Sequence, residues 1–304
     1  MVAVSVLILT KNGARDLERL LPTLYRQKLT SPFEVIAVDS GSTDDTLGLL
    51  QRYPLQVTQI SPDAFHHART RNFAATMASG EILVYLSQDA IPASELWLHN
   101  MLANFDDSNV GAVYGRQIPK PGSFAERHET LDTLYGARRF VKDPAHRNGL
   151  GYRFYHFSNA NSAIRRSVWS ATQFPEDMKV FEDLGIAKLI LDSGWKIVYE
   201  PEASVYHSHN HSTVGLFKRY FDIGYTLKKL KIWDAPGTRQ SLSRDAWKML
   251  ERKIKRSAHH RTKHSARQAI QKDIAKSVGF FLGLNQACLP LALKRHFSAF
   301  RVFG

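Results

Sequence analysis

The stretch Val4-Ser5-Val6-Leu7-Ile8-Leu9-Thr10 is a continuous run of mostly apolar and β-branched residues. A run of this length without polar alternation is typical of a strand buried on both faces of a parallel sheet. Two similar runs follow at 33–38 and 82–86, with a shorter one at 57–60 between them. The first 90 residues therefore predict at least four neighbouring strands.

Helical patterns separate these strands. Leucines at 17, 20, 21 and 24 recur at helical spacing, a second helix is expected to begin near Thr46, and a third covers 69–78 and ends at Gly80. This alternation predicts an α/β fold with a mainly parallel, Rossmann-like sheet flanked by helices. Beyond residue 110 we expect strands at 110–114, 162–164 and 195–199, a helix at 182–193, and a long loop region with one helix at 116–151.

Charge is unevenly distributed along the 304 residues. The chain has 41 Lys and Arg against 28 Asp and Glu, a net charge of +13. Residues 1–225 hold 23 basic and 24 acidic side chains, whereas residues 226–304 hold 18 and 4. We therefore predict a near-neutral domain over 1–225 and a basic helical C-terminal region over 226–304. Such a region attracts phosphate, on nucleic acid or on an anionic membrane.

Several classes of protein are excluded by composition and motif. The single cysteine, Cys288, excludes a disulfide framework and a cysteine-built zinc site. The N-terminus lacks the pattern of a signal peptide, and no run of 18 apolar residues is present, so we expect a cytoplasmic protein without a membrane-spanning helix. Neither GxxxxGK[ST] nor GxGxxG occurs, so a nucleotide would have to bind by other means.

Polar residues follow three of the predicted strands. Thr10, Asp39 and Asp89 each come at or just after the end of an apolar run. Ligands of open α/β sheets bind beyond the carboxyl ends of the strands, so these side chains are expected to converge. Asp39 is interpreted as functional, because a carboxylate at the end of a buried strand is costly without a partner. Asp44 is interpreted as a turn and helix-cap residue.

Three further clusters could carry chemistry. His66 to Asn72 places Arg71 near a helix start, where it could hold a phosphate or belong to a solvated basic turn. Glu182 and Asp183 open a helix, where acidic residues are favoured in any case. His207, His209 and His211 alternate along an extended segment, as metal or diphosphate ligands or as a surface histidine run.

The order of these clusters resembles that of family 2 glycosyltransferases with the GT-A fold. Within that family, five stretches resemble the bacterial rhamnosyltransferase branch: 65–72, 87–92, 114–117, 157–159 and 206–210. The similarity extends over about residues 3–225. It implies that a nucleotide-diphosphate sugar is bound by Thr10, Asp39, Ser40, Arg71, Gln88 and Asp89, with Asp39 accepting a hydrogen bond from the base.

The resemblance also implies roles in catalysis. Asp89 stands at the second acid of the family's Asp-x-Asp motif and would bind Mg²⁺ or Mn²⁺, with His207 completing the site. Asp183 would be the base that deprotonates the acceptor hydroxyl, and Glu182 would support it. The first acid of the motif is Gln88 here, which leaves one carboxylate for the ion.

The reaction so implied is an inverting transfer of L-rhamnose from dTDP-rhamnose to a hydroxyl of a polysaccharide or lipid-linked saccharide. A UDP-hexose or UDP-N-acetylhexosamine donor is the alternative within the family. A nucleic-acid-binding protein is a competing hypothesis from the basic region, but no helix-turn-helix or RNA-binding pattern supports it, and no nucleic acid is expected. A nucleotidyltransferase would need a glycine-rich phosphate loop, which Lys11-Asn12-Gly13 does not supply.

The basic C-terminal region suggests a second partner. Basic residues over 244–276 are interleaved with Trp247, Leu250, Ile254, Ile270 and Ile274, and a more apolar stretch follows at 278–293, interrupted by Asn285, Gln286 and Pro290. This pattern predicts peripheral contact with the anionic inner face of the bacterial plasma membrane. The alternative is a pair of ordinary helices that pack on the catalytic domain and expose a solvated basic face.

Overall fold

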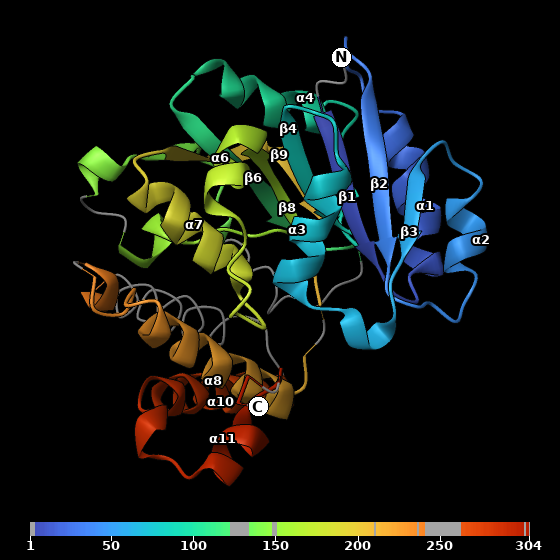
Figure 1. Cartoon of the computed structure of the whole chain (residues 1–304). Coiled ribbons are helices and arrows are strands. Elements are labelled where there is room, and N and C mark those ends of the chain that lie inside the picture. The colour runs from blue at the N-terminus through green and yellow to red at the C-terminus, as the bar shows by residue number, and fades with distance from the viewer. Residues whose placement is uncertain are drawn as a thin grey trace. The chain divides into compact units, whose positions relative to one another are not determined.

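The computed structural model describes residues 4–121, 134–147, 151–209, 211–235, 237–240, 263–300 and 302–303 (Figure 1). The chain forms two compact units. The first, here called the sheet unit, comprises residues 1–146, 156–177 and 182–208. The second, the helical unit, comprises 147–155, 178–181 and 209–304. The predicted domain boundary at 225 and 226 lies inside helix α8 of the second unit.

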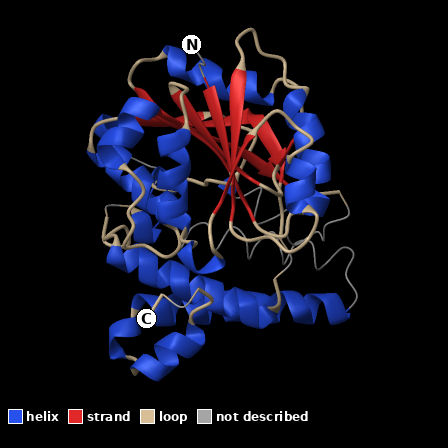
Figure 2. Cartoon of the chain, turned by 45° about the vertical axis from the view of Figure 1, so that its right-hand side comes forward, coloured by secondary structure: helices blue, strands red, loops and turns tan. Residues whose placement is uncertain are grey.

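The sheet unit is built on a sheet in the order β3-β2-β1-β4-β8-β6-β9-β5, with β7 also paired to β9. The strands are β1 (Val4–Thr10), β2 (Phe33–Asp39), β3 (Gln56–Gln59), β4 (Ile82–Ser87), β5 (Ile91–Pro92), β6 (Val110–Ile118), β7 (Phe140–Lys142), β8 (Asn161–Arg165) and β9 (Lys196–Tyr206). Strand β1 lies between β2 and β4, and Val6 is opposite both Val35 and Val84. Helices cover both faces of the sheet (Figure 2), so the side chains of this central strand are buried on both faces, as the apolar run predicted.

The expected parallel arrangement is found in β3, β2, β1 and β4. The rest of the sheet is mixed. Strand β8 runs antiparallel to both β4 and β6, β9 runs parallel to β6, and β5 and β7 run antiparallel to β9. The sheet is therefore less uniformly parallel than the sequence predicted, because apolar runs locate strands without giving their direction.

Helices cover both faces of this sheet (Figure 2). They are α1 (Ala14–Tyr25), α2 (Thr46–Leu50), α3 (His67–Met77), α4 (Trp97–Leu102), α6 (Arg166–Thr172) and α7 (Glu182–Asp192), with 3₁₀ turns at Pro62–Ala64, Ala103–Asp106 and Pro144–His146. The four leucines of α1 at the predicted helical spacing are fully buried against the sheet. The long loop region expected at 116–151 lies partly outside the described residues.

The helical unit contains α8 (Thr213–Lys229), α10 (Lys263–Leu284) and α11 (Leu291–Phe297), with 3₁₀ turns at Gly151–Phe154 and Gln286–Cys288. Helices α8 and α10 approach closely at three glycines. A Cβ atom added to Gly224, Gly279 or Gly283 would lie 2.0–2.3 Å from a backbone oxygen of the other helix. The expected basic helix over 244–276 is described only from residue 263, because residues 241–262 lie outside the described part of the chain.

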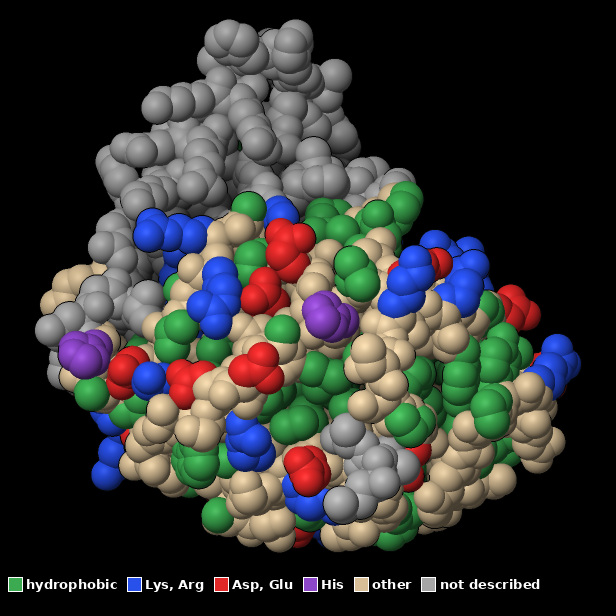
Figure 3. Space-filling view, turned by 90° about the horizontal axis from the view of Figure 1, so that it is seen from above, with side chains coloured by type: hydrophobic (Ala, Val, Ile, Leu, Met, Phe, Trp, Pro, Cys, Tyr) green, Lys and Arg blue, Asp and Glu red, His purple; other side chains and the backbone are tan. Residues whose placement is uncertain are grey.

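No helix in the described ranges is long and apolar enough to cross a bilayer. Figure 3 shows acidic and basic side chains interspersed over the face that it presents, without segregation into one sign. This distribution agrees with the near-zero net charge of residues 1–225.

Candidate functional site

The carboxyl ends of β1, β2 and β4 surround a cavity of about 310 Å³. Its lining includes Thr10, Lys11, Ser40, His67, Arg71, Gln88, Asp89 and Asn159. Five of the predicted donor-binding residues therefore line one cavity, and the sixth, Asp39, is fully buried and hydrogen-bonded to Thr10. Of the other predicted residues, Glu182 contacts Arg71 and His207 contacts Asp89. The polar side chains that follow the predicted strands therefore lie close together, as expected.

Asp39 finds its partners in the loop that follows β2. The hydroxyl of Thr10 donates to one carboxylate oxygen at 3.1 Å, and the backbone N–H groups of Gly41 and Ser42 donate to the other at 2.9 and 2.8 Å. The Ser42 hydroxyl also donates to Asp39. Gly41 has φ of +78°, a conformation that a side chain would disfavour. The carboxylate thus shapes the turn. Two of its four hydrogen-bond donors are hydroxyl groups, which can rotate away so that a ligand donates in their place.

Gln88 holds the backbone of the first loop. The Lys11 N–H donates to Gln88 Oε1 at 2.9 Å, and Gln88 Nε2 donates to the Lys11 carbonyl at 3.1 Å. An amide can satisfy both groups, whereas a carboxylate could only accept. The side chain lies against Gly13, where an added Cβ would be 2.3 Å from Oε1. Lys11 in turn donates through Nζ to the Ser40 and Gly41 carbonyls, so these contacts tie the three strand ends together.

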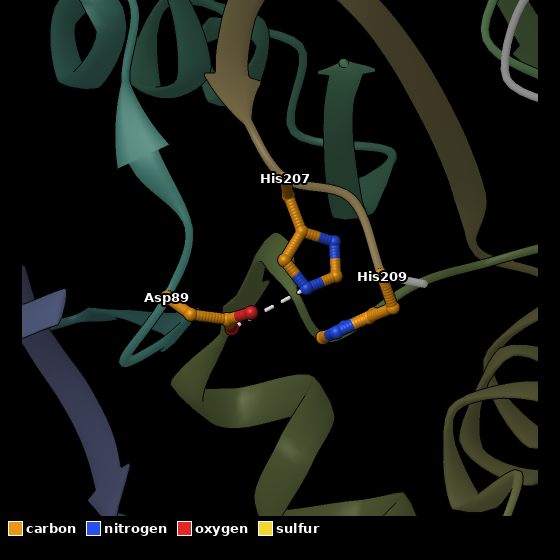
Figure 4. Close-up of side chains that lie close together, drawn as sticks. All are labelled: Asp89, His207 and His209. Atoms are coloured by element: carbon orange, nitrogen blue, oxygen red, sulfur yellow. Dashed lines mark ion pairs between the residues drawn. The ribbon is translucent and has the colours of Figure 1, made fainter. Parts of the chain in front are cut away.

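Asp89 and His207 form the centre of the second part of the site. His207 Nε2 lies 3.4 Å from Asp89 Oδ1, and Lys120 Nζ lies 3.5 Å from Asp89 Oδ2. In Figure 4 a dashed line joins the Asp89 carboxylate to the His207 ring.

The orientation of His207 is fixed by Gln117. Gln117 Nε2 donates to Tyr135 Oη and to Ser158 Oγ, each at 2.8 Å, so its Oε1 faces His207 Nδ1 at 2.8 Å. An oxygen at that place accepts a hydrogen bond from the Nδ1–H group, which leaves the lone pair of Nε2 directed toward Asp89. A carboxylate and an imidazole nitrogen directed toward each other form a suitable pair of ligands for a divalent cation.

Arg71, which lines the cavity, forms a buried ion pair with Glu182. The Arg71 Nη1 to Glu182 Oε1 distance is 2.7 Å, and the side chains are 12% and 7% exposed. Burial raises the pKa of Glu182, but the Arg71 guanidinium and His67 outweigh it and leave that pKa below its ordinary value. Burial also lowers the pKa of His67, so this imidazole is neutral at pH 7. Asn159 donates to the same Glu182 oxygen at 3.3 Å.

Asp183 is half-buried at the first turn of α7, and the Leu184 N–H donates to its carboxylate at 2.9 Å. The residue before α7, Phe181, has φ of 56°, which is rare for an aromatic side chain and costs about 1–3 kcal/mol. Its ring packs at right angles to Phe300, 6.2 Å between centroids, within the helical unit. The chain therefore enters the Glu182-Asp183 pair through a strained residue that is held by packing.

Several residues of the site had no assigned role in the sequence. Lys11 and Asn159 line the cavity, Lys120 contacts Asp89, and Gln117 contacts His207. Gln117 and Asn159 end two of the stretches that resemble rhamnosyltransferases, which was the only signal for them. Lys11 was visible only as part of a turn, and Lys120 had no signal.

Comparison with known proteins agrees with this geometry. Residues 5–171 match the family model described as glycosyl transferase family 2. The chain is 32% identical to the O-antigen chain rhamnosyltransferase WbaN of Salmonella anatum, over 92% of this chain and 88% of the relative. It is 29% identical to the O-antigen chain rhamnosyltransferase RfbN of Salmonella typhimurium, over 99% and 95%. The fold is similar to the mannosyltransferase PcManGT of Pyrobaculum calidifontis, solved with GDP-Man and Mn²⁺, with a TM-score of 0.60, 20% identity and coverage of 94% and 86%.

Proposed function

The chain belongs to glycosyl transferase family 2, and from that premise we propose that it transfers L-rhamnose from dTDP-rhamnose to a hydroxyl of an O-antigen-type polysaccharide or its lipid-linked precursor. The observation that carries this proposal is the cavity at the strand ends, whose lining includes Arg71 and also Asp89, which contacts His207. The rhamnosyl donor is taken from the two O-antigen rhamnosyltransferases, each of which aligns with more than nine-tenths of this chain.

A divalent cation fits the donor set that the structure presents. Asp89 offers a carboxylate oxygen and His207 an imidazole nitrogen, 3.4 Å apart. Imidazole suits Mn²⁺ better than Mg²⁺, which prefers oxygen ligands and a retained water shell. Asp89 and His207 would hold the ion. When bound, the cation stabilises the negative charge that develops on the leaving diphosphate.

The basic residues around the cavity would bind and orient the donor. Two cationic side chains line the cavity, Lys11 and Arg71, and a third, Lys120, contacts Asp89 of its lining. The Arg71 guanidinium has five N–H donors in a planar fork, which is more than the donors directed at Glu182 and His67. The buried ion pair thus fixes the guanidinium in place, which limits reorganisation when a phosphate binds.

Asp183 would accept the proton of the acceptor hydroxyl. A sugar hydroxyl has a pKa far above neutrality, so a positioned base must take its proton as the new bond forms. A base opposite the leaving diphosphate gives one in-line displacement, with inversion at the anomeric carbon. Glu182, paired with Arg71, remains ionised and would support the site by holding the start of α7 against α3.

The donor and the stereochemistry can be tested in one assay. The purified chain would be incubated with Mn²⁺, lipid-linked saccharides extracted from bacterial membranes, and labelled dTDP-rhamnose, UDP-glucose or UDP-N-acetylglucosamine. We expect transfer from dTDP-rhamnose, with an anomeric configuration in the product opposite to that of the donor by NMR. Transfer from a UDP-sugar alone would replace rhamnose by the alternative donor, and retention of configuration would reject Asp183 as a simple base.

A further inference from the structure

Large apolar side chains on the surface gather in the helical unit. Of the twelve that are exposed in the described part of the chain, eight belong to this unit. They are Val214, Ile270, Ile274, Val278, Phe281, Leu291, Leu293 and Phe300. Scattered single apolar residues on a surface need no explanation, but a concentration of this kind marks a site of interaction.

Four of these residues form a line along α10, here called the α10 stripe. Ile270, Ile274, Val278 and Phe281 are spaced by four, four and three positions, so they share one face of the helix. Their exposed fractions are 59%, 57%, 45% and 64%. The spacing is that of an amphipathic helix whose apolar face would normally be buried. In the described residues this face is directed to solvent.

The opposite face of α10 makes the contacts within the unit. Gly279 and Gly283 lie about half a turn around the helix from the stripe and contact the α8 backbone at Phe217 and Phe221. Close glycine contacts of this kind hold two helices without large side chains between them. The stripe therefore takes no part in the packing of α8 on α10. Packing between these two helices does not explain why the stripe residues are apolar.

The charge of the region identifies the kind of partner. Residues 226–304 hold 18 basic and 4 acidic side chains. Lys272 and Lys276 of α10 lie on the face opposite the stripe, where Lys276 Nζ is over the Tyr220 ring of α8, so the positive charge is a property of the whole region and not of the stripe itself. A second copy of this region would bring the same charge and be repelled. A nucleic acid would be attracted by the charge but would leave the stripe uncovered. A surface that is anionic outside and apolar just beneath matches both features.

We propose that the α10 stripe docks on the surface of an anionic lipid bilayer. The helix lies in the plane of the interface, with Ile270, Ile274, Val278 and Phe281 inserted among the headgroups and the basic residues paired with lipid phosphates. This is association with one leaflet, in keeping with the lack of a spanning helix in the described ranges. The proposal does not depend on which sugar the sheet unit transfers.

The test is flotation of the full chain with lipid vesicles. Vesicles containing phosphatidylglycerol are compared with vesicles of phosphatidylcholine alone at about 150 mM salt, where exposed charges are screened beyond a Debye length. The stripe variant is Ile274→Gln with Phe281→Gln. The matched control is Leu96→Gln with Leu189→Gln, two exposed apolar residues of the sheet unit, at 48% and 40% exposure.

We expect the natural chain and the control to float with the anionic vesicles and not with the neutral ones. The affinity of the stripe variant for the anionic vesicles should be at least about ten-fold lower, because two inserted apolar side chains are lost. Its unfolding temperature and its hydrolysis of donor without vesicles should be unchanged, which separates this test from that of the proposed function.

Three outcomes would overturn the proposal. The first is failure of the natural chain to float with anionic vesicles. The second is flotation of the stripe variant equal to that of the natural chain, which would leave charge alone as the cause. The third is sedimentation of the natural chain as a dimer that the stripe variant does not form, which would make a second copy the occupant of the stripe.

Discussion

The two units of this chain treat their apolar residues in opposite ways. In the sheet unit, Val6, Ile8 and Val84 are fully buried, and the polar side chains gather where the strands end. In the helical unit, glycines hold α8 to α10 while large apolar side chains along α10 face solvent. Burial of apolar area is the main favourable term in folding. In the sheet unit, apolar burial stabilises the strands whose ends carry the polar site. In the helical unit, part of the apolar area stays exposed, where a partner could bury it.

The contrast between the two units predicts that catalysis can be removed from the sheet unit without affecting the binding surface of the helical unit. Asp183→Asn keeps the shape of the side chain but not its basicity. We expect the turnover number to fall by roughly 10²–10⁴-fold, the usual effect of losing a positioned base. Affinity for the nucleotide, measured by calorimetry, should be unchanged, and so should flotation with vesicles. Normal turnover in this variant would require another base.

Breaking the buried ion pair should instead affect the fold of the sheet unit. Arg71→Ala leaves the Glu182 carboxylate buried without its partner at 2.7 Å. Removing one member of a buried pair costs about 3–5 kcal/mol. Urea unfolding should show this loss, and Lys188→Ala, which removes an exposed pair with Asp192, should cost less than about 1 kcal/mol. Equal losses in the two variants would mean that Arg71 is not structurally important.

A third substitution tests the role assigned to Gln88. Gln88→Glu restores an acid at the first position of the motif but removes the donor to the Lys11 carbonyl. We expect a loss of about 0.5–1.5 kcal/mol in stability, the net contribution of an ordinary hydrogen bond, because the Lys11 carbonyl is exposed and water can replace the lost donor. Mn²⁺ affinity, measured by calorimetry, should not rise. A rise in affinity with unchanged stability would show that Gln88 is a replaced metal ligand.

The smallest effect expected is a dependence of stability on pH. In the folded state the pKa of Glu182 lies below its ordinary value, so the stability contributed by its ionised form is present at neutral pH and is lost as the pH falls through the folded pKa. The lowered pKa of His67 acts in the same direction, since the unfolded chain takes up that proton first as the pH falls. As the pH falls below about 4.5, the ordinary pKa of this carboxyl group, unfolding temperatures should therefore fall less steeply in Glu182→Gln than in the natural chain. Parallel curves would contradict this assignment.

The sequence predicted these two units unequally. Strands β1, β2 and β4 were visible because each is a buried run of six or seven residues, and Thr10, Asp39 and Asp89 followed from where those runs end. Strands β5 and β7 were not, because runs of two and three residues carry no periodicity.

The contacts that organise the site were also beyond the reach of the sequence. Gln88 bonds Lys11 across 77 positions, and Gln117 bonds His207 across 90. No local pattern encodes a pairing of that kind, since it depends on which strands become neighbours. The opposite faces of α10 could be read only once Gly279 and Gly283 were found against α8.

The proposed function requires the strand-end cavity to bind a nucleotide diphosphate through Asp89, His207 and a divalent cation. A thermal-shift measurement with dTDP and UDP, in Mn²⁺ or in EDTA, on the natural chain and on Asp89→Ala tests this binding. A ligand at 100 times its Kd stabilises the folded state by about 2.7 kcal/mol. We expect a clear rise in unfolding temperature in Mn²⁺ that is absent in EDTA and in the variant. No shift with either nucleotide, or an equal shift in all conditions, would contradict it.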